Sequence, residues 1–137
     1  MVWSEMSCML KPSPLRGIGV FATHDIPAGA IVFTSTFEFR TLKVKDVPPA
    51  LLRFCIYISD EECICPERFD RMEIGWYINH SDTPNIARKS TIPFTEAIKS
   101  TQERAIYAIC DIKAGDEILI DYNHLDEPEH LKEDFYR

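Results

Sequence analysis

The side chains that could bind a ligand or take part in chemistry gather in one short stretch of this chain, from Trp76 to Asn85. Asn79, His80 and Asn85 lie within it, and each of these side chains can both donate and accept hydrogen bonds. If such a cluster is buried it needs polar partners, as in a ligand-binding site. Asn-His-Ser and Asp-Thr-Pro-Asn are also common turn sequences, so the stretch taken alone fits a surface turn equally well.

Two further patterns could cooperate with this stretch. Gly17-Ile18-Gly19 is a glycine-spaced turn, which would let a ligand approach the backbone, although a simple tight turn explains it as well. The run from Glu117 to Tyr122 reads as a strand that ends in a carboxylic acid and a phenol. A tyrosine in that place is more often a packing residue than a catalytic one, so neither pattern alone identifies an activity.

Length and composition predict a single domain of residues 1–137 that can bury a real core. Hydrophobic residues make up 45% and charged residues 27% of the chain, as in ordinary globular proteins. The formal net charge of −7 argues against direct binding to nucleic acid or to an anionic membrane surface, since both favour an excess of Lys and Arg. It suits a basic partner such as a lysine-rich protein segment, although such a charge also simply aids solubility.

The five cysteines and the N-terminus bear on location. An odd number of cysteines in a chain with an ordinary core indicates reduced thiols inside a cell. The N-terminus has no pattern of a secretory signal, and no apolar run reaches the ~18 residues of a membrane span. We therefore expect an intracellular protein of the cytoplasm or nucleus. Cys63-Ile64-Cys65 could be half of a zinc site, but the sequence holds no second pair, so no metal is expected.

Hydrophobic periodicity and turn residues predict a mainly β chain with short helices. Residues 1–14 are expected to form a strand followed by a break at Lys11-Pro12-Ser13-Pro14, and residues 15–22 a glycine-broken turn that enters a β-rich run. Further strands are expected over 30–33, 34–44, 105–109 and 118–120, with a strand pair over 86–94. Pro48-Pro49 opens a run with apolar residues at helical spacing through Ile58, which predicts a helix. A second short helix is expected from Glu67 to Gly75. The acidic tail from Asp126 to Asp134 fits a solvated tail or a surface helix.

One pattern occurs twice, at a constant offset. Residues 21–32 read Phe-Ala-x-x-Asp-Ile-x-Ala-Gly-x-x-Val, and residues 107–118 repeat this pattern with Tyr for Phe and Ile for Val. Each copy predicts a strand, an Asp-Ile-x-Ala-Gly turn with a positive φ at the glycine, and a second strand. Two such units indicate a pseudo-symmetric β fold, in which we expect them to flank the middle of the chain.

Taken together in chain order, three motifs resemble those of the SET-domain family of protein lysine methyltransferases. They are Gly-Ile-Gly-Val-Phe-Ala at 17–22, Tyr-Ile-Asn-His-Ser-x-x-Pro-Asn at 77–85, and Ala-Gly-Asp-Glu-Ile-x-x-Asp-Tyr at 114–122. Each could arise by chance, but three in order at this spacing are specific. The resemblance implies a minimal SET domain with its motifs in about residues 15–124, followed by an acidic tail over 125–137. The implied fold is β-clip-like, with several small sheets and a knot-like crossing near the C-terminus.

The resemblance also implies a reaction, in which S-adenosylmethionine donates a methyl group to a lysine side chain of a protein. The backbone around Ile18 and Gly19 would hold this cofactor together with Asn79 and His80. The crossing would bring Asn79-His80 beside Tyr122, which would contact the cofactor and serve as the catalytic hydroxyl. The channel for the substrate lysine would be lined by Ile120, Tyr107 and Tyr77.

The chemistry of that reaction fits these residue types. A protonated lysine, with a reference pKa of ~10.4, has no lone pair, and a desolvated channel beside a sulfonium cation shifts its amine toward the neutral form. Holding the amine and the methyl donor in line can lower the activation barrier by several kcal/mol, up to ~7–11 in good cases. Few catalytic side chains are then needed, in agreement with the absence of an obvious acid–base pair in the sequence.

The sequence departs from the family pattern at several positions. Trp76 stands where the central motif usually opens with an arginine that helps to hold the cofactor's carboxylate, so another basic residue or the backbone must do so. Asp82 replaces a cysteine that often follows Asn-His-Ser, so zinc-binding modules are not expected. Ile120 stands where Phe or Tyr is usual, and an aliphatic side chain there favours more than monomethylation. Phe135 and Tyr136 are candidates for the last wall of the channel, besides plain surface packing.

These departures leave alternatives open. The leading hypothesis is an active methyltransferase acting on an exposed lysine of a histone or another basic protein. A catalytically weak or inactive SET-fold module that binds protein is the second, and a structural β protein with coincidental motifs is the third. A homodimer that completes the substrate groove also stays open, and the sequence identifies neither the substrate protein nor the number of methyl groups added.

Overall fold

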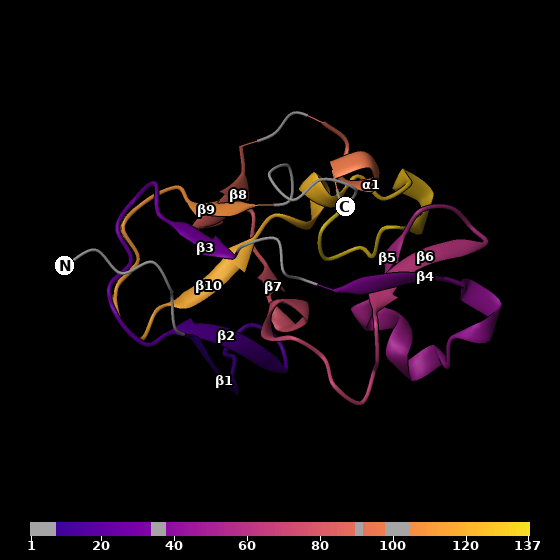
Figure 1. Cartoon of the computed structure of the whole chain (residues 1–137), viewed down its shortest axis with the longest axis horizontal. Helices are drawn as coiled ribbons and strands as arrows, with labels where there is room; N and C mark the ends of the chain where they lie inside the picture. Colours follow the sequence, from indigo (N-terminus) through magenta and orange to yellow (C-terminus); the bar gives the residue numbers. More distant parts are fainter. Residues whose placement is uncertain (1–7, 34–37, 90–91, 98–104) are drawn as a thin grey trace.

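The short apolar runs of the sequence, each ended by glycine, proline or a polar turn, form three small sheets (Figure 1). The computed structural model describes residues 8–33, 38–89, 92–97 and 105–137. The largest sheet has the order β1-β2-β10-β7, formed by Cys8–Pro12, Ile18–Ala22, Glu117–Ile120 and Asn79–His80. The second has the order β3-β9-β8, formed by Ile31–Phe33, Ile106–Ala108 and Ile86–Arg88. The third has the order β4-β6-β5, formed by Phe39–Lys43, Glu62–Pro66 and Ile56–Tyr57.

Helical structure in the described segments is limited to short turns. They are the α-helical turn α1 (Phe94–Ala97) and the 3-10 turns η1 (Val44–Asp46), η2 (Pro49–Phe54), η3 (Ile74–Tyr77), η4 (Tyr122–Leu125) and η5 (Glu129–Leu131). The prediction of a mainly β chain with short helices is confirmed. None of the described helices is long and apolar enough to cross a membrane.

Most of the predicted strands form, although they are shorter than expected. The runs 15–22, 30–33, 105–109 and 118–120 contain β2, β3, β9 and β10, and the runs 1–14 and 34–44 contain β1 and β4. The remainder of the last two predictions, at 1–7 and 34–37, lies outside the described residues. β1 is an edge strand, which explains how it tolerates Pro12.

Three predicted elements are wrong. Only β8 forms within 86–94, where a strand pair was expected, and Phe94 begins α1 instead; residues 90–91 lie outside the described residues. The helix expected after Pro48 stops as the 3-10 turn η2, because the β-branched run that follows pairs as β5 with β6. The helix expected from Glu67 to Gly75 is a loop that ends in η3, since its apolar residues serve two different cores.

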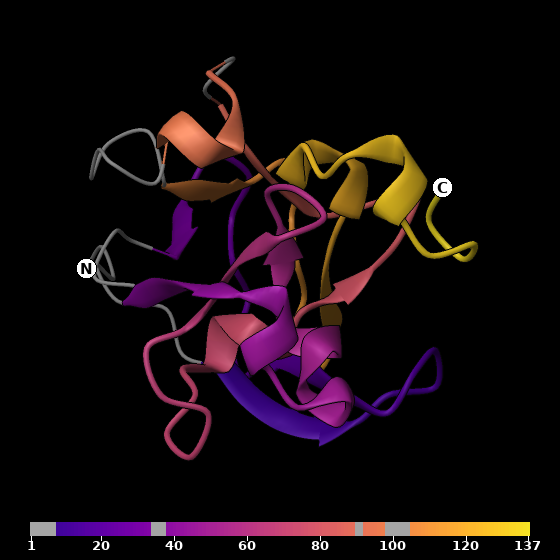
Figure 2. The ribbon, with the colours of Figure 1, turned by 90° about the vertical axis from the view of Figure 1, so that its right-hand side faces the viewer.

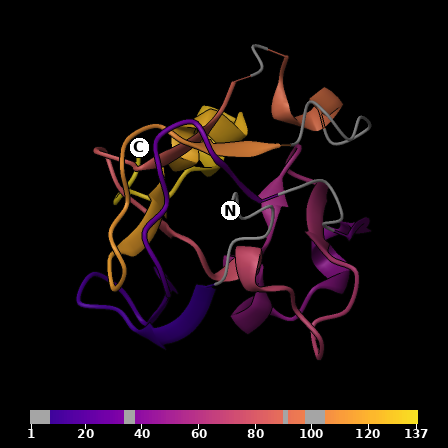
Figure 3. The ribbon, with the colours of Figure 1, turned by 60° about the vertical axis from the view of Figure 1, so that its left-hand side comes forward.

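The two copies of the repeat pair with each other, rather than flank the middle of the chain as expected. Ile26 and Ile112 exchange backbone hydrogen bonds of 2.7 and 2.8 Å, and both side chains are buried in the main core. The aspartates of the two copies also bind each other's turn. The Asp111 carboxylate accepts a hydrogen bond of 2.9 Å from the Ala28 backbone, and the Asp25 carboxylate accepts one of 2.9 Å from the Ala114 backbone. The two turns run side by side (Figure 3). The repeat therefore builds a pseudo-two-fold core from the two ends of the chain.

The residues between the two repeats supply a second, smaller core under the sheet β4-β6-β5. It contains Val47 and three buried thiols, Cys55, Cys63 and Cys65, and Phe69 packs against it. Burial raises the pKa of all three thiols, which keeps them protonated. Figure 2, seen from this side of the molecule, shows the chain end folded back beside this sheet.

Strand β10 is held on both sides in the centre of the fold (Figure 1). It pairs antiparallel with β2 and parallel with β7, and the loop after β7 continues the contact. The Asn85 amide behaves like a strand partner, donating to the Glu117 carbonyl and accepting from the Leu119 backbone, both at 2.8 Å. The chain end thus crosses beside the 79–85 segment, as the resemblance to the family implies.

A substitution at Gly115 tests the positive φ that the repeat requires. Gly115 has a φ of 90°, and a Cβ added there meets no atom within 4 Å. Gly115→Ala should therefore lower the free energy of unfolding by about 1–2 kcal/mol through backbone strain alone. Gly115→Asn should cost less, because asparagine tolerates positive φ. Urea unfolding of both variants measures this; equal stability of Gly115→Ala and the wild type would contradict the assignment.

Candidate active site

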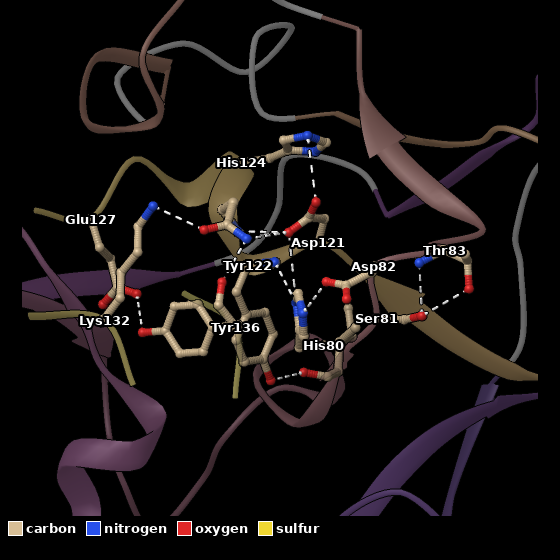
Figure 4. Close-up of polar contacts among 12 residues, drawn as sticks. His80, Ser81, Asp82, Thr83, Asp121, Tyr122, His124, Glu127, Lys132 and Tyr136 are labelled. Atoms are coloured by element: carbon tan, nitrogen blue, oxygen red, sulfur yellow. Dashed lines mark hydrogen bonds and ion pairs between the residues drawn. The ribbon is translucent and has the colours of Figure 1, made fainter. Parts of the chain in front are cut away.

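Tyr122 lies at the point where β10 gives way to η4. Asp121 caps that turn by accepting a hydrogen bond of 2.9 Å from the Asn123 backbone. The Tyr122 hydroxyl donates to the Ile78 carbonyl at 2.6 Å (Figure 4). Burial raises the pKa of Tyr122 to about 12, against the opposing charges of Arg16 and Arg53. The phenol is therefore neutral at physiological pH, with its proton directed at a backbone oxygen.

His80 fixes the backbone of Tyr122 from the neighbouring strand. Its Nδ1 lies 3.0 Å from the Tyr122 nitrogen, and its Nε2 lies 3.0 Å from a carboxylate oxygen of Asp82 (Figure 4). Because a backbone N–H can only donate, Nδ1 must accept, and the proton of the neutral ring lies on Nε2 and is donated to Asp82. Both ring nitrogens of this buried side chain are thus used within the protein.

The chain end completes an aromatic cluster around Tyr122. The rings of His80, Tyr122, Phe135 and Tyr136 contact one another with centroids 4.9–6.1 Å apart. The buried carboxylate of Glu127 holds this end in place, accepting from the Tyr136 hydroxyl at 2.7 Å and from the Tyr57 backbone at 2.8 Å. The expected surface helix forms only as the short turn η5, and the alternative of a freely solvated tail is wrong, because Glu127 anchors the segment by a buried polar contact.

The glycine turn lies on the other side of this cluster and is held by Asn79. The buried Asn79 amide donates to the carbonyls of Arg16 and Ile18, at 3.0 and 3.2 Å, and to the Glu117 carboxylate at 2.9 Å. Ser13 donates to the same carboxylate at 2.8 Å. A Cβ added at Gly19 would collide with the Glu117 side chain, so only glycine fits there without displacing it.

Comparison with known proteins decides the family. The sequence profile of the SET domain matches residues 17–123, which include all three motifs. The chain belongs to the SET-domain family. A crystal structure of a proposed histone methyltransferase of Plasmodium falciparum has a similar fold, with a TM-score of 0.55 and 23% sequence identity over 82% of this chain and 90% of that one. Comparison with curated proteins gives no match.

The structure of this SET domain brings together some of the predicted site residues. Ile18, Gly19, Asn79, His80 and Tyr122 lie around one junction, where the glycine turn, β7 and the end of β10 meet. Their contacts with a cofactor stay a prediction. The side chains of Asn79 and His80 are engaged within the protein, so the structure adds a positioning role for both.

The predicted channel residues are less closely grouped. Ile120 is buried in the main core, and Tyr77 packs against that core with its ring 5.6 Å from that of Phe54. Tyr107 lies on β9, with the Lys89 ammonium 4.2 Å from its ring centroid. β9 belongs to a different sheet from β10, which leads into Tyr122, and the channel roles of all three residues stay predictions. Trp76 is half-buried in η3.

Several residues that shape the site were not predicted as part of it. Arg16 stacks on Phe135, with its Cζ 3.5 Å from the ring centroid, and Arg53 of η2 reaches the glycine turn. Glu117 is partly buried and binds Asn79 beside the glycine turn, and Glu127 is buried and binds Tyr136 of the chain end. Glu117 could have been found from the sequence, because it lies inside the third motif, whereas Arg53 and Glu127 meet the site only through the tertiary fold. No group of three metal-ligating side chains suited to a metal ion occurs among the described residues.

The contact between Gly19 and Glu117 can be tested with a double-mutant cycle. Gly19→Ala should displace the Glu117 carboxylate from Asn79 and lower the free energy of unfolding by about 1–3 kcal/mol. In a Glu117→Ala background the same change should cost less, with a coupling free energy of about 0.5–3 kcal/mol. Chemical unfolding of the four proteins gives this value, and purely additive effects would show that the two side chains do not compete for one space.

The anchor of the chain end predicts a pH dependence. Burial raises the pKa of Glu127, although hydrogen bonds from Tyr136 and Tyr57 act in the opposite direction. The folded state therefore binds this proton more tightly than the unfolded state, so the contribution of Glu127 is most favourable below its unfolded pKa and declines as pH rises through the folded one.

Glu127→Gln should remove that decline while keeping an acceptor for the Tyr57 backbone. The stability of the variant relative to the wild type should then increase from about pH 4 to about pH 7. Urea unfolding across this range measures it. Glu61→Gln, at an exposed carboxylate elsewhere on the surface, is the matched control and should not show the trend. A pH-independent difference for Glu127→Gln would contradict the raised pKa.

Proposed function

We propose that this SET domain is a protein-lysine N-methyltransferase that transfers a methyl group from S-adenosylmethionine to a lysine in a basic protein segment. The observation that carries the proposal is the Tyr122 phenol. It is neutral, oriented by the Ile78 carbonyl, and packed beside the glycine turn and the Asn79-His80 segment. The description of the Plasmodium protein as a proposed histone methyltransferase supports the same class of reaction.

The residues of the junction fit the proposed cofactor. The turn at Gly17 exposes backbone next to Ile18, which is 50% exposed, and two guanidinium groups lie close by. A molecule with one carboxylate and a flat aromatic base finds suitable partners in such a place. When bound, S-adenosylmethionine supplies a sulfonium methyl group that a neutral amine can attack.

The contribution of the protein to this reaction is orientation. Since the Tyr122 proton is donated to Ile78, the free lone pairs of the phenol oxygen can accept a hydrogen bond from the substrate amine. The His80 ring, by accepting from the Tyr122 backbone, keeps the phenol from shifting along the chain. The amine must arrive without its proton, which burial beside positive charge favours. Positioning of this kind can supply several kcal/mol, up to ~7–11 in good cases.

The net charge of the chain supports a basic substrate. The chain has 22 acidic and 15 basic residues, which suits a lysine-rich segment as a partner. The target protein and the final number of methyl groups are best identified by mass spectrometry of a cell lysate incubated with the protein and an isotopically labelled methyl donor.

Tyr122→Phe tests the proposal directly. Removing a hydroxyl that bonds the reacting groups should slow methyl transfer by about 10- to 100-fold. The measurement is transfer of a radiolabelled methyl group from S-adenosylmethionine to lysine-rich proteins. Tyr57→Phe, which deletes a hydroxyl outside the aromatic cluster, is the matched control and should retain activity. Undiminished transfer by Tyr122→Phe would remove Tyr122 from its role, and cofactor binding without transfer by the wild type would favour a binding module.

A further inference from the structure

The break between β1 and β2 contains a serine that is followed directly by a proline. Ser13 and Pro14 open the turn that leads to Gly17. Ser13 is half-buried, whereas residues 9–12 and 14–18 on either side of it are exposed. β1 forms the edge of its sheet, so this part of the chain can be approached from outside. An enzyme that acts on the chain can therefore reach this segment.

The Ser13 hydroxyl closes the turn. Its Oγ lies 2.8 and 3.0 Å from the two carboxylate oxygens of Glu117, to which it donates its one proton. The same oxygen accepts hydrogen bonds from the backbone of Leu15 at 3.0 Å and of Arg16 at 3.3 Å. The Ser13 backbone also donates to the Gly17 carbonyl at 2.8 Å. One hydroxyl thus shapes the turn and fastens it to β10.

Glu117 has little room to move away from this hydroxyl. Its carboxylate also accepts from the Asn79 amide at 2.9 Å, and a Cβ built on Gly19 would collide with it. The carboxylate therefore fills the space over the glycine turn, between Ser13 and Asn79. A negative group in place of the Ser13 proton would face a carboxylate that is held from other sides.

We propose that Ser13 is a phosphorylation site for a proline-directed protein kinase, and that the phosphate releases the glycine turn from Glu117. Such kinases bind an extended segment in which a proline follows the serine, and Pro14 disfavours helical backbone at Ser13. Arg16 adds a cation three residues after the serine. The modification deepens the proposed function, because Ile18 and Gly19 of the same turn belong to the predicted cofactor site.

The phosphoryl transfer itself is ordinary kinase chemistry. The bond between the γ-phosphorus of ATP and its bridging oxygen breaks, and a bond from the Ser13 Oγ to phosphorus forms. ADP leaves, and the hydroxyl proton passes to the base of the kinase. The product carries a charge of about −1.5 to −2 at pH 7 and three acceptor oxygens.

This change turns a hydrogen-bond donor into an acceptor. The contact between Ser13 and Glu117 becomes a repulsion between two negative groups. The backbone N–H groups of Leu15 and Arg16 can still bind a phosphate oxygen, and the Arg16 guanidinium attracts the phosphate as well. The turn should therefore move with the phosphate, away from β10.

The first test asks whether a kinase modifies this serine. The full-length protein is incubated with ATP and a proline-directed kinase of the cyclin-dependent class, and mass spectrometry locates the phosphate. The wild type should take it up at Ser13, and Ser13→Ala should not. Thr83 is the other hydroxyl residue followed by proline, so Thr83→Ala is the matched control and should be modified like the wild type. Modification of Thr83 alone, or of neither residue, would overturn the assignment.

The second test asks whether the phosphate frees the turn. Hydrogen exchange of the peptide that covers residues 13–19 should become about 10- to 100-fold faster on phosphorylation, because bonds to a charged group are lost. Exchange over β6 (Glu62–Pro66) should not change. Ser13→Glu should act in the same direction, and more strongly than Ser13→Ala, which removes the hydroxyl without adding charge. Unchanged exchange after phosphorylation, or equal effects of the two variants, would overturn the role of the phosphate charge.

Calorimetry with S-adenosylmethionine separates this inference, which rests on the proposed function for its effect on the cofactor, from that function itself. The phosphorylated protein should bind the cofactor about 10- to 100-fold less tightly than the unmodified protein. If both forms bind it equally, regulation of the site is overturned and the methyl donor stands. If the unmodified protein does not bind it, the proposed function fails, while the phosphate at Ser13 and its effect on exchange are still decided by the first two tests.

Discussion

The fold depends on the hydrogen bonds with which one polar segment holds strand β10. Asn85 pairs with the backbone of Glu117 and Leu119 as a strand would, Asn79 binds the Glu117 side chain, and His80 accepts from the backbone of Tyr122. Unpaired buried amides would cost about 1–3 kcal/mol each, so these contacts fix the register of β10 as well as its place. The position of Tyr122 is a consequence of that register.

The polar residues of the central motif therefore hold together the elements that position Tyr122. Asn79 ties the glycine turn to β10 through the Arg16 and Ile18 carbonyls, and the close approach at Gly19 leaves the turn little freedom. The chain end closes the other side, because Glu127 and Asn123 hold Tyr136 against His80 and Tyr122. Two parts of the chain far apart in sequence thus meet at one phenol.

The sequence predicted what depends on local pattern and on motifs, and it failed where tertiary contacts decide. The repeat correctly indicated two hairpin-like units with left-handed glycines at Gly29 and Gly115, but a pattern cannot say that its two copies pair with each other. The apolar spacing after Pro48 indicated a helix, yet β6 offers a pairing edge that the β-branched residues prefer. The burial of Glu127 has no local signal, since it arises from contacts with Tyr57 and Tyr136.

The distribution of charge explains how an acidic protein could act on a cationic substrate. A net negative surface attracts a lysine-rich segment over long distances, whereas the reaction needs an amine that has lost its proton. Arg16 and Arg53 place positive charge next to Tyr122 and oppose the effect of burial on the phenol. The same charges, together with burial, would lower the pKa of a lysine amine that reaches the phenol, because both disfavour a further positive charge there.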